Sequence, residues 1–121
     1  MRFETLHLLL SLAALHDWEI KALDVKTAFL FGELDEEIYM EQCEGFIVKG
    51  KEKKVCRLGK AIYGLKQAAL QWNKRLHGSL LEMGFTRCKS DPGTYFKIVR
   101  GGIIILLVYV DDALFMGSNK T

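Results

Sequence analysis

The stretch that decides the fold reads Ile103-Ile104-Ile105-Leu106-Leu107-Val108-Tyr109-Val110-Asp111-Asp112. Its apolar run has the length of a buried strand and falls far short of the ~20 residues that a membrane-spanning helix needs. Two adjacent carboxylates end the run. Side by side at a hairpin tip they repel each other, and a divalent cation, which prefers oxygen ligands, removes that repulsion. Aspartates are also common in ordinary turns, so the pair alone leaves both interpretations open.

The residues around this run predict two hairpins in series. Residues 91–93, with the sequence Asp-Pro-Gly, are a turn signal, and residues 94–99 have the composition of a strand. Residues 100–102 form a tight connection into the apolar run. The Asp pair then occupies a second turn, from which residues 113–116 run back. The last third of the chain is therefore predicted to be mostly β-structure.

The first quarter of the chain predicts a helix, a strand and a short second helix. Residues 2–16 carry apolar side chains at helical spacing. The same segment vaguely resembles a signal peptide, which would make this a secreted protein, but acidic and polar residues interrupt the expected charged-then-apolar order. Residues 18–24 alternate as a strand does, and residues 27–31 form a short helical stretch that stops at Gly32.

The middle of the chain predicts a small antiparallel excursion between two charged turns. Residues 33–37 are an acidic turn and residues 49–54 a basic one, both expected to be solvated. Short strands are predicted over residues 38–40, 46–48 and 55–58.

The longest helix is predicted next, and it stops at Gly84, which can adopt the left-handed conformation just past a helix end. Its apolar face is expected to consist of Leu65, Ala69, Trp72, Leu76, Leu80 and Met83. The order of helix, strand, small hairpins, long helix and hairpins indicates the α+β class.

Composition places weak limits on function. The chain has 121 residues, enough for one domain or part of one, and half of them are apolar, so a core can form. The net charge of +2 neither indicates nor excludes a nucleic-acid partner. The three cysteines, Cys43, Cys56 and Cys88, are too few and too widely spaced for a disulfide framework or a zinc site, and we expect reduced thiols in a cytosolic or nuclear protein.

Asp24 strengthens the metal interpretation of the Asp pair. It ends another apolar strand, far from Asp111 and Asp112 in the sequence. If the strands share a sheet, the three carboxylates converge at one rim, where they could hold two metal ions roughly 4 Å apart for in-line attack at phosphorus. Asp24 could also serve as the N-cap of the following helix, and both roles are compatible.

Five segments resemble, in order and spacing, the reverse transcriptases of copia-type LTR retrotransposons. They are Leu23-Asp24-Val25-Lys26-Thr27-Ala28-Phe29-Leu30, Glu36-Glu37-Ile38-Tyr39-Met40, Ile62-Tyr63-Gly64-Leu65-Lys66-Gln67-Ala68, Ser90-Asp91 with Tyr95, and Leu107-Val108-Tyr109-Val110-Asp111-Asp112. The likeness runs through nearly the whole chain. It implies an RNA-directed DNA polymerase with a palm-like antiparallel sheet and packed helices.

The resemblance also implies roles for individual residues. Asp24 and Asp111 would be metal ligands and Asp112 the third, less direct carboxylate. Phe29 would abut the sugar of the incoming nucleotide and exclude a 2′-hydroxyl; without the family match, Phe29 would be taken as an ordinary core aromatic.

Three further residues would contact substrates according to the resemblance. Gln67 would contact the nucleotide or template near the active site, and Lys66 is a weaker candidate for the same role. Tyr109 would pack beside the primer end, or would simply be a β-forming aromatic within its strand.

The cofactor implied by the resemblance is Mg²⁺, with Mn²⁺ as the alternative. The implied partners are an RNA or DNA template with its primer, deoxynucleoside triphosphates and the rest of the Pol polyprotein, without a membrane. The expected location is a cytoplasmic virus-like particle or the nucleus. Residues 1–121 would form a partial reverse transcriptase domain, with the fingers incomplete and the thumb beyond Thr121.

Three positions depart from the family pattern. Cys43 stands where the family usually has Pro, Ala69-Leu70 where it has Pro-Arg, and Phe31 where a small polar residue is typical. None of these changes removes a catalytic carboxylate. They are changes that a decaying genomic copy accumulates, so a catalytically inactive retrotransposon relic is the alternative interpretation. Without fingers and thumb, the isolated segment is expected to be inactive.

Overall fold

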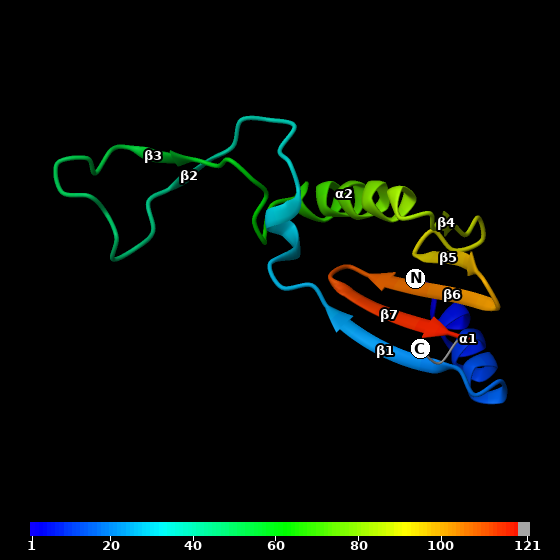
Figure 1. Ribbon diagram of the computed structural model, residues 1–121. Helices are drawn as coiled ribbons and strands as arrows, with labels where there is room; N and C mark the ends of the chain where they lie inside the picture. Colours follow the sequence, from blue (N-terminus) through cyan, green and yellow to red (C-terminus); the bar gives the residue numbers. More distant parts are fainter. Residues whose placement is uncertain (119–121) are drawn as a thin grey trace. The chain divides into compact units, whose positions relative to one another are not determined.

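A computed structural model describes residues 1–118 and confirms the α+β class. By contacts the chain divides into a first unit, Met1–Lys26 with the residues from Leu76 onward, and a second unit, Thr27–Arg75. The elements in chain order are α1 (Phe3–Leu15), β1 (Glu19–Asp24), the 3-10 helix η1 (Ala28–Phe31), β2 (Tyr39–Glu41), β3 (Val55–Arg57), α2 (Ala68–Glu82), β4 (Thr86–Arg87), β5 (Thr94–Val99), β6 (Gly102–Tyr109) and β7 (Asp112–Gly117) (Figure 1).

The first unit is built on an antiparallel sheet. Within the described residues this sheet has five strands in the order β1-β7-β6-β5-β4. The hairpins β5–β6 and β6–β7 are the two predicted from sequence. Strand β1 pairs with β7 and forms one edge, and all six of its residues are exposed. The two-residue strand β4 was not predicted, because a segment this short carries no periodicity.

The central strand β6 is buried on both faces, which explains its unbroken apolar sequence. Alternate side chains of a strand point to opposite faces. One face packs on α1 and the other on the C-terminal half of α2 (Figure 1). The α1 side is centred on Ala13, Ile105, Leu107 and Met116. The α2 side is centred on Leu80, Tyr95, Leu106 and Val108.

The second unit contains η1, the β2–β3 ribbon and the first half of α2. Strands β2 and β3 pair antiparallel, with Met40 opposite Cys56, as predicted for the excursion. The predicted strand over residues 46–48 is wrong. Val48 donates its backbone N–H to the side-chain Oε1 of Gln42 at 3.0 Å, so an amide side chain takes the place of a neighbouring strand.

The predicted apolar face of the long helix is partly wrong. Helix α2 begins at Ala68, so Leu65 lies before it. Ala69 and Met83 are exposed, whereas Ala68 and Gln71 are buried. Met83 lies just beyond Glu82, the last residue of α2. A single stripe drawn along the whole helix therefore misplaces residues at both ends.

The predicted stop at Gly84 is confirmed in detail. Gly84 has φ +86°, the left-handed conformation that glycine adopts without steric cost. Its N–H donates to Leu81 O at 3.0 Å, and the N–H of Phe85 donates to Leu80 O at 3.0 Å. This double closure is the Schellman motif, which satisfies the last carbonyls of the helix.

In the part of the chain that is described, neither helix combines the length and apolar character needed to cross a bilayer. Cys43, Cys56 and Cys88 carry free thiols, the first two exposed and the third partly buried.

Candidate metal centre

The sheet brings Asp24 and Asp112 face to face. They end β1 and begin β7, and they are directly paired in the antiparallel register. Residues paired in this way carry their side chains on the same face of the sheet. Asp111 lies in the turn between β6 and β7, and its carbonyl accepts the N–H of Val25 at 2.9 Å. This hydrogen bond continues the β1–β7 ladder and ties the end of β1 to the turn, as the predicted convergence requires.

The three carboxylates lie close enough to share a cation. One carboxylate oxygen from each of Asp24, Asp111 and Asp112 can be chosen so that all three lie within 4.8 Å of one another. At such separations each pair of like charges repels by roughly 1 kcal/mol in water, and by more where the surroundings are less polar. Asp24 and Asp112 are exposed and Asp111 is half-buried. Oxygen-only ligands with open sides fit a hard divalent ion that keeps water or phosphate oxygens as its other ligands.

The turn that carries Asp111 is conformationally strained. The two turn residues are Val110 and Asp111, between the paired residues Tyr109 and Asp112. Val110 has φ +56°, whereas Asp111 is not among the residues with positive φ. A positive φ at the first turn residue alone is the pattern of a type II′ turn, which favours glycine there. A β-branched residue in this conformation is an outlier of the kind that clusters at functional sites.

Tyr109 continues the row of side chains that contains Asp112 and Asp24. It pairs with Asp112 across the hairpin, so the three lie side by side on β6, β7 and β1. The Tyr109 side chain is 58% exposed at the end of its strand. This exposure leaves its ring accessible beside the carboxylates.

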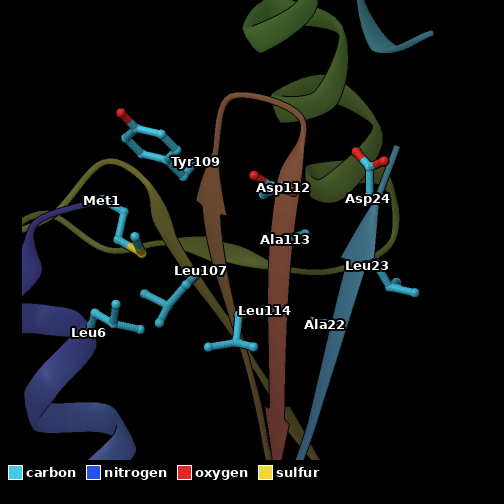
Figure 2. Close-up of a pocket in the computed structure, with 10 residues that line it drawn as sticks. All are labelled: Met1, Leu6, Ala22, Leu23, Asp24, Leu107, Tyr109, Asp112, Ala113 and Leu114. Atoms are coloured by element: carbon cyan, nitrogen blue, oxygen red, sulfur yellow. The ribbon is translucent and has the colours of Figure 1, made fainter. Parts of the chain in front are cut away.

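An apolar cleft lies below this row on the α1 face of the sheet. Its volume is about 380 Å³, and Figure 2 shows its floor of aliphatic side chains between the sheet and the start of α1. Leu107, Leu114 and Ala22 come from the three strands, and Met1 and Leu6 from the opposite side. The carboxylates of Asp24 and Asp112 therefore border hydrocarbon on one side and solvent on the other.

Asp24 is not a helix N-cap. The residue at the N-cap of η1 is Thr27, which has φ +56° and makes no side-chain capping hydrogen bond. The alternative structural role considered for Asp24 is therefore wrong. The register with Asp112 remains the feature that accounts for its position.

Three of the four residues predicted to contact substrate, Phe29, Lys66 and Gln67, belong to the second unit. Phe29 is 9% exposed, and its ring centroid lies 4.3 Å from that of Tyr63. Gln67 is partly buried just before α2, and its Oε1 is buried without a hydrogen-bond partner among the described residues. Lys66 is exposed. An acceptor left without a donor costs about 1–3 kcal/mol, so Gln67 is the one of these three with an unmet requirement.

Asp91 is a buried carboxylate that the sequence prediction treated only as part of a turn and a family motif. It is 2% exposed and accepts the N–H of Arg2 at 2.7 Å and that of Gly93 at 3.0 Å. The amino group of Met1 lies 3.5 Å away. Burial by itself would raise the pKa of Asp91, but the hydrogen bonds from Arg2, Thr5 and Gly93 and the positive N-terminus outweigh it, and the pKa falls from 3.8 to about 2.

The contacts of Asp91 connect the start of α1 to the strand that precedes the Asp pair. Gly93 O accepts the N–H of Val108 at 2.8 Å. A Cβ on Gly93 would lie 3.0 Å from Val108 O and closer still to Met1, so only glycine fits. No sequence signal marked this role, because the carboxylate and its Arg2 partner are 89 residues apart.

Comparison with known proteins identifies the family. A family model described as reverse transcriptase (RNA-dependent DNA polymerase) matches residues 1–121. The chain belongs to this family. It is 49% identical, over 99% of its length, to the retrovirus-related Pol polyprotein from transposon TNT 1-94 of Nicotiana tabacum. It is 43% identical, over 97% of its length, to the Pol polyprotein from transposon RE1 of Arabidopsis thaliana.

These relatives are much longer than this chain. The chain spans 9% of the Nicotiana polyprotein and 8% of the Arabidopsis polyprotein. A Ty5-1 transposon protein of Saccharomyces cerevisiae is 42% identical over 76% of this chain, which covers 30% of that protein. No solved structure matches the chain significantly.

Proposed function

We propose that the chain is the palm portion of an RNA-directed DNA polymerase encoded in a copia-type retrotransposon Pol polyprotein, acting in DNA synthesis during transposition. In this proposal Asp24, Asp111 and Asp112 hold the divalent ions of nucleotidyl transfer, Mg²⁺ or alternatively Mn²⁺. The observation that supports it best is the convergence of three carboxylates, from strands far apart in sequence, within 4.8 Å of one another. An antiparallel sheet backed by helices on both faces suits a palm.

The chain's own residues would hold and position the divalent ions and would form no covalent bond with the substrate. Bound divalent ions would supply Lewis acidity for the attacking hydroxyl and the leaving pyrophosphate. Asp24 and Asp112 are held by the β1–β7 ladder and Asp111 by the turn that Val25 closes, so little reorganisation is needed for all three to bind at once. Such preorganisation, together with substrate positioning, accounts for most of the catalysis of phosphoryl transfer.

Tyr109 and Gln67 have surroundings compatible with substrate contacts. Tyr109 is exposed in the row of carboxylates, where it could pack beside the primer end. Gln67 Oε1 has a buried lone pair that a donor group of a nucleotide or template could satisfy. Lys66 is exposed and available for phosphate. The partners we propose are a template with primer, deoxynucleoside triphosphates and the rest of the Pol polyprotein, in cytoplasmic virus-like particles or the nucleus.

Phe29 has two competing roles that one experiment separates. Its contact with Tyr63 suits a core aromatic, and its position in the motif suits a barrier to the 2′-hydroxyl of the incoming sugar. In a complete related polymerase carrying this segment, Phe29→Ala should raise the ratio of ribonucleotide to deoxynucleotide incorporation. An unchanged ratio with lower stability would leave only the core role.

The alternative is that the chain is a catalytically inactive retrotransposon relic. The residues that depart from the family pattern favour this alternative. At Cys43 the turn is closed by a backbone hydrogen bond, from the N–H of Phe46 to the Cys43 carbonyl at 3.0 Å, which does not depend on Pro. Ala69 and Leu70 are both exposed near the start of α2, and neither can make the polar contacts of an Arg. Any deficit is therefore expected to concern contacts with nucleic acid or phosphate rather than folding.

The test is Mg²⁺-dependent primer extension on an RNA template. The segment is grafted into a complete related polymerase, with Asp111→Asn as the inactive control and Glu82→Gln, an exposed carboxylate at the end of α2, as the matched neutral control. Extension that only Asp111→Asn abolishes would support the proposal. A folded graft that fails to extend any primer would make the relic the better account.

A further inference from the structure

The loop between β2 and β3 is held in one conformation by a single side chain. We call residues 42–54 the lysine loop. Gln42 Nε2 donates to the carbonyl of Lys51 at 2.8 Å and to that of Lys54 at 2.9 Å, and its Oε1 accepts the N–H of Val48 at 3.0 Å. These bonds close the loop from inside, at the end of the β2–β3 ribbon away from η1 (Figure 1). Its charged side chains are therefore displayed from a fixed backbone.

The lysine loop concentrates the positive charge of the chain. Residues 49–54 contain four lysines and one glutamate, a net charge of +3. Glu44 brings the net charge of the whole lysine loop to +2, which equals that of the chain, so the remaining residues together are neutral. All four lysines are exposed, and within residues 1–118 none of their ammonium groups forms an ion pair. Arg57 on the adjoining strand differs, since Glu37 pairs with it at 2.9 Å.

The one acidic residue among these lysines is engaged with the backbone. Glu52 Oε1 accepts the N–H of Gly50 at 2.8 Å. That hydrogen bond, followed by one from the N–H of Glu52 itself, lowers the pKa of this carboxyl. Glu52 thus helps to shape the loop instead of pairing with its lysines, whose charges remain available to an external anion.

An exposed aromatic ring accompanies the lysines. Phe46 is 81% exposed, next to Ile47 at 54% and Val48 at 52%. A tight turn presents it, with Gly45 at φ +81° and a hydrogen bond from the N–H of Phe46 to Cys43 O. Basic side chains that follow a phosphate backbone, combined with aromatic rings on which bases stack, are the features by which proteins bind single strands without sequence preference.

We propose that the lysine loop binds single-stranded nucleic acid, with its lysines on phosphates and Phe46 stacked on a base. The inference rests on the proposed function only for the biological identity of the strand, which would be the template. Binding itself needs neither metal nor catalysis. Neither Gln42 nor Phe46 belongs to the carboxylate site, and the loop lies in the other unit.

The test is fluorescence anisotropy of a labelled oligonucleotide of about 12 nucleotides. It is run on the full chain at sub-micromolar concentration, with EDTA present so that the carboxylate site plays no part. Neutralisation of single-strand phosphates gives a slope of log affinity against log salt of about −0.7 per contact, so four lysines predict a slope of about −3. Lys51→Ala with Lys53→Ala should reduce the magnitude of that slope by roughly 1.4.

Two other variants separate stacking and loop order from charge. Phe46→Ala should weaken binding roughly ten-fold at every salt concentration without changing the slope. Gln42→Ala removes no charge but releases the loop backbone, and it should also weaken binding. The matched control is Lys21→Ala with Lys89→Ala, two exposed lysines of the first unit, which should leave affinity and slope nearly unchanged.

The result of this binding test does not depend on whether the carboxylates form a catalytic site. Asp111→Asn should bind the oligonucleotide as well as the unmodified chain does, whatever it does to primer extension. Equal losses from the loop variants and the lysine control would overturn the proposal, as would binding that is absent or independent of salt. Binding to anionic lipid vesicles with none to the oligonucleotide would also overturn it and would identify the loop as a membrane-surface element.

Discussion

At the scale of single residues, the three carboxylates of the candidate site differ from Asp91 in how far the sequence predicts them. The convergence of Asp24, Asp111 and Asp112 could be predicted, because each follows an apolar stretch and strand ends meet at the rim of a sheet. Asp91 could not be assigned its role, because an Asp-Pro-Gly turn is ordinary and the contacts that bury its carboxylate come from the other end of the chain. Long-range polar partners leave no local pattern.

Asp91 should make stability depend on acid pH. Its pKa is lowered on folding, so its contribution is fully present above the ordinary value of 3.8 and is lost as the pH falls through about 2. The shift corresponds to about 2 kcal/mol. Asp91→Asn should therefore unfold in less urea at pH 7, and its difference from the unmodified chain should shrink as the pH is lowered from about 5 toward 2.

The matched variant for this pH series is Glu44→Gln, which neutralises an exposed carboxylate. Its difference from the unmodified chain should stay small throughout. A constant gap between Asp91→Asn and the unmodified chain across the whole pH range would show that the charge of Asp91 contributes nothing to folding.

The backbone conformation of Val110 predicts that a change to glycine stabilises the fold. Its φ of +56° is unfavourable for a β-branched residue and costs on the order of 1–3 kcal/mol, only part of which glycine's greater entropy in the unfolded chain offsets. Val110→Gly should therefore raise the free energy of unfolding by about 1 kcal/mol in urea titrations. Val99→Gly, at the end of β5, should lower it, and a decrease of equal size at both positions would contradict the strain.

At the scale of elements, most of the secondary structure followed from periodicity and turn chemistry. Strands β5, β6 and β7 and the helix stop at Gly84 were predicted, because glycine, proline and aspartate mark the turns around them. The strand expected at residues 46–48 did not form, because Gln42 binds the backbone there. The buried side of α2 was misassigned at its ends, because the helix runs only from Ala68 to Glu82 and leaves Leu65 and Met83 outside it.

Helix α2 contains a position where stability can be gained. Gly78 lies in its interior, is exposed, and a Cβ there would meet no atom within 4 Å. Alanine in a helix interior is more favourable than glycine by up to about 1 kcal/mol. Gly78→Ala should raise the melting temperature, measured by circular dichroism.

The control for that prediction is Gly32, where a Cβ would lie 3.0 Å from Gln71 Cβ and 3.2 Å from Trp72 N. Gly32→Ala should lower the melting temperature, because the nearest atoms belong to a helix that has little room to shift. A lower melting temperature for Gly78→Ala would mean that α2 is not helical at this position in solution.

At the scale of the whole molecule, the α+β class was predictable but the division into two units was not. A continuous helix crosses from Thr27–Arg75 into the other unit, and no change of composition marks the passage. Nothing in the alternating pattern of residues 19–24 indicates that β1 would lie at the edge of the sheet with all six residues exposed. Alternation identifies a strand but does not reveal whether anything covers it.

The exposed edge should make the isolated chain associate with itself and dissolve poorly. Strand β1 ends the sheet and exposes Ile20 at 43% and Leu23 at 53%. Unprotected strand edges pair with other chains, and a lysine on the edge suppresses this. Ile20→Lys should reduce concentration-dependent association in sedimentation velocity. Leu15→Lys removes a still more exposed apolar residue, at 75%, from the end of α1 and should not reduce association. Equal effects of the two variants would exclude the edge as the cause.

The central claim is that Asp24, Asp111 and Asp112 form one metal site, and a Mn²⁺ titration followed by electron paramagnetic resonance tests it most directly. The unmodified chain should remove free Mn²⁺ from solution, and Mg²⁺ should compete for the same site. Asp111→Asn should lose this binding, whereas Glu44→Gln should retain it. Equal Mn²⁺ binding by all three proteins, or none by the unmodified chain, would contradict the account.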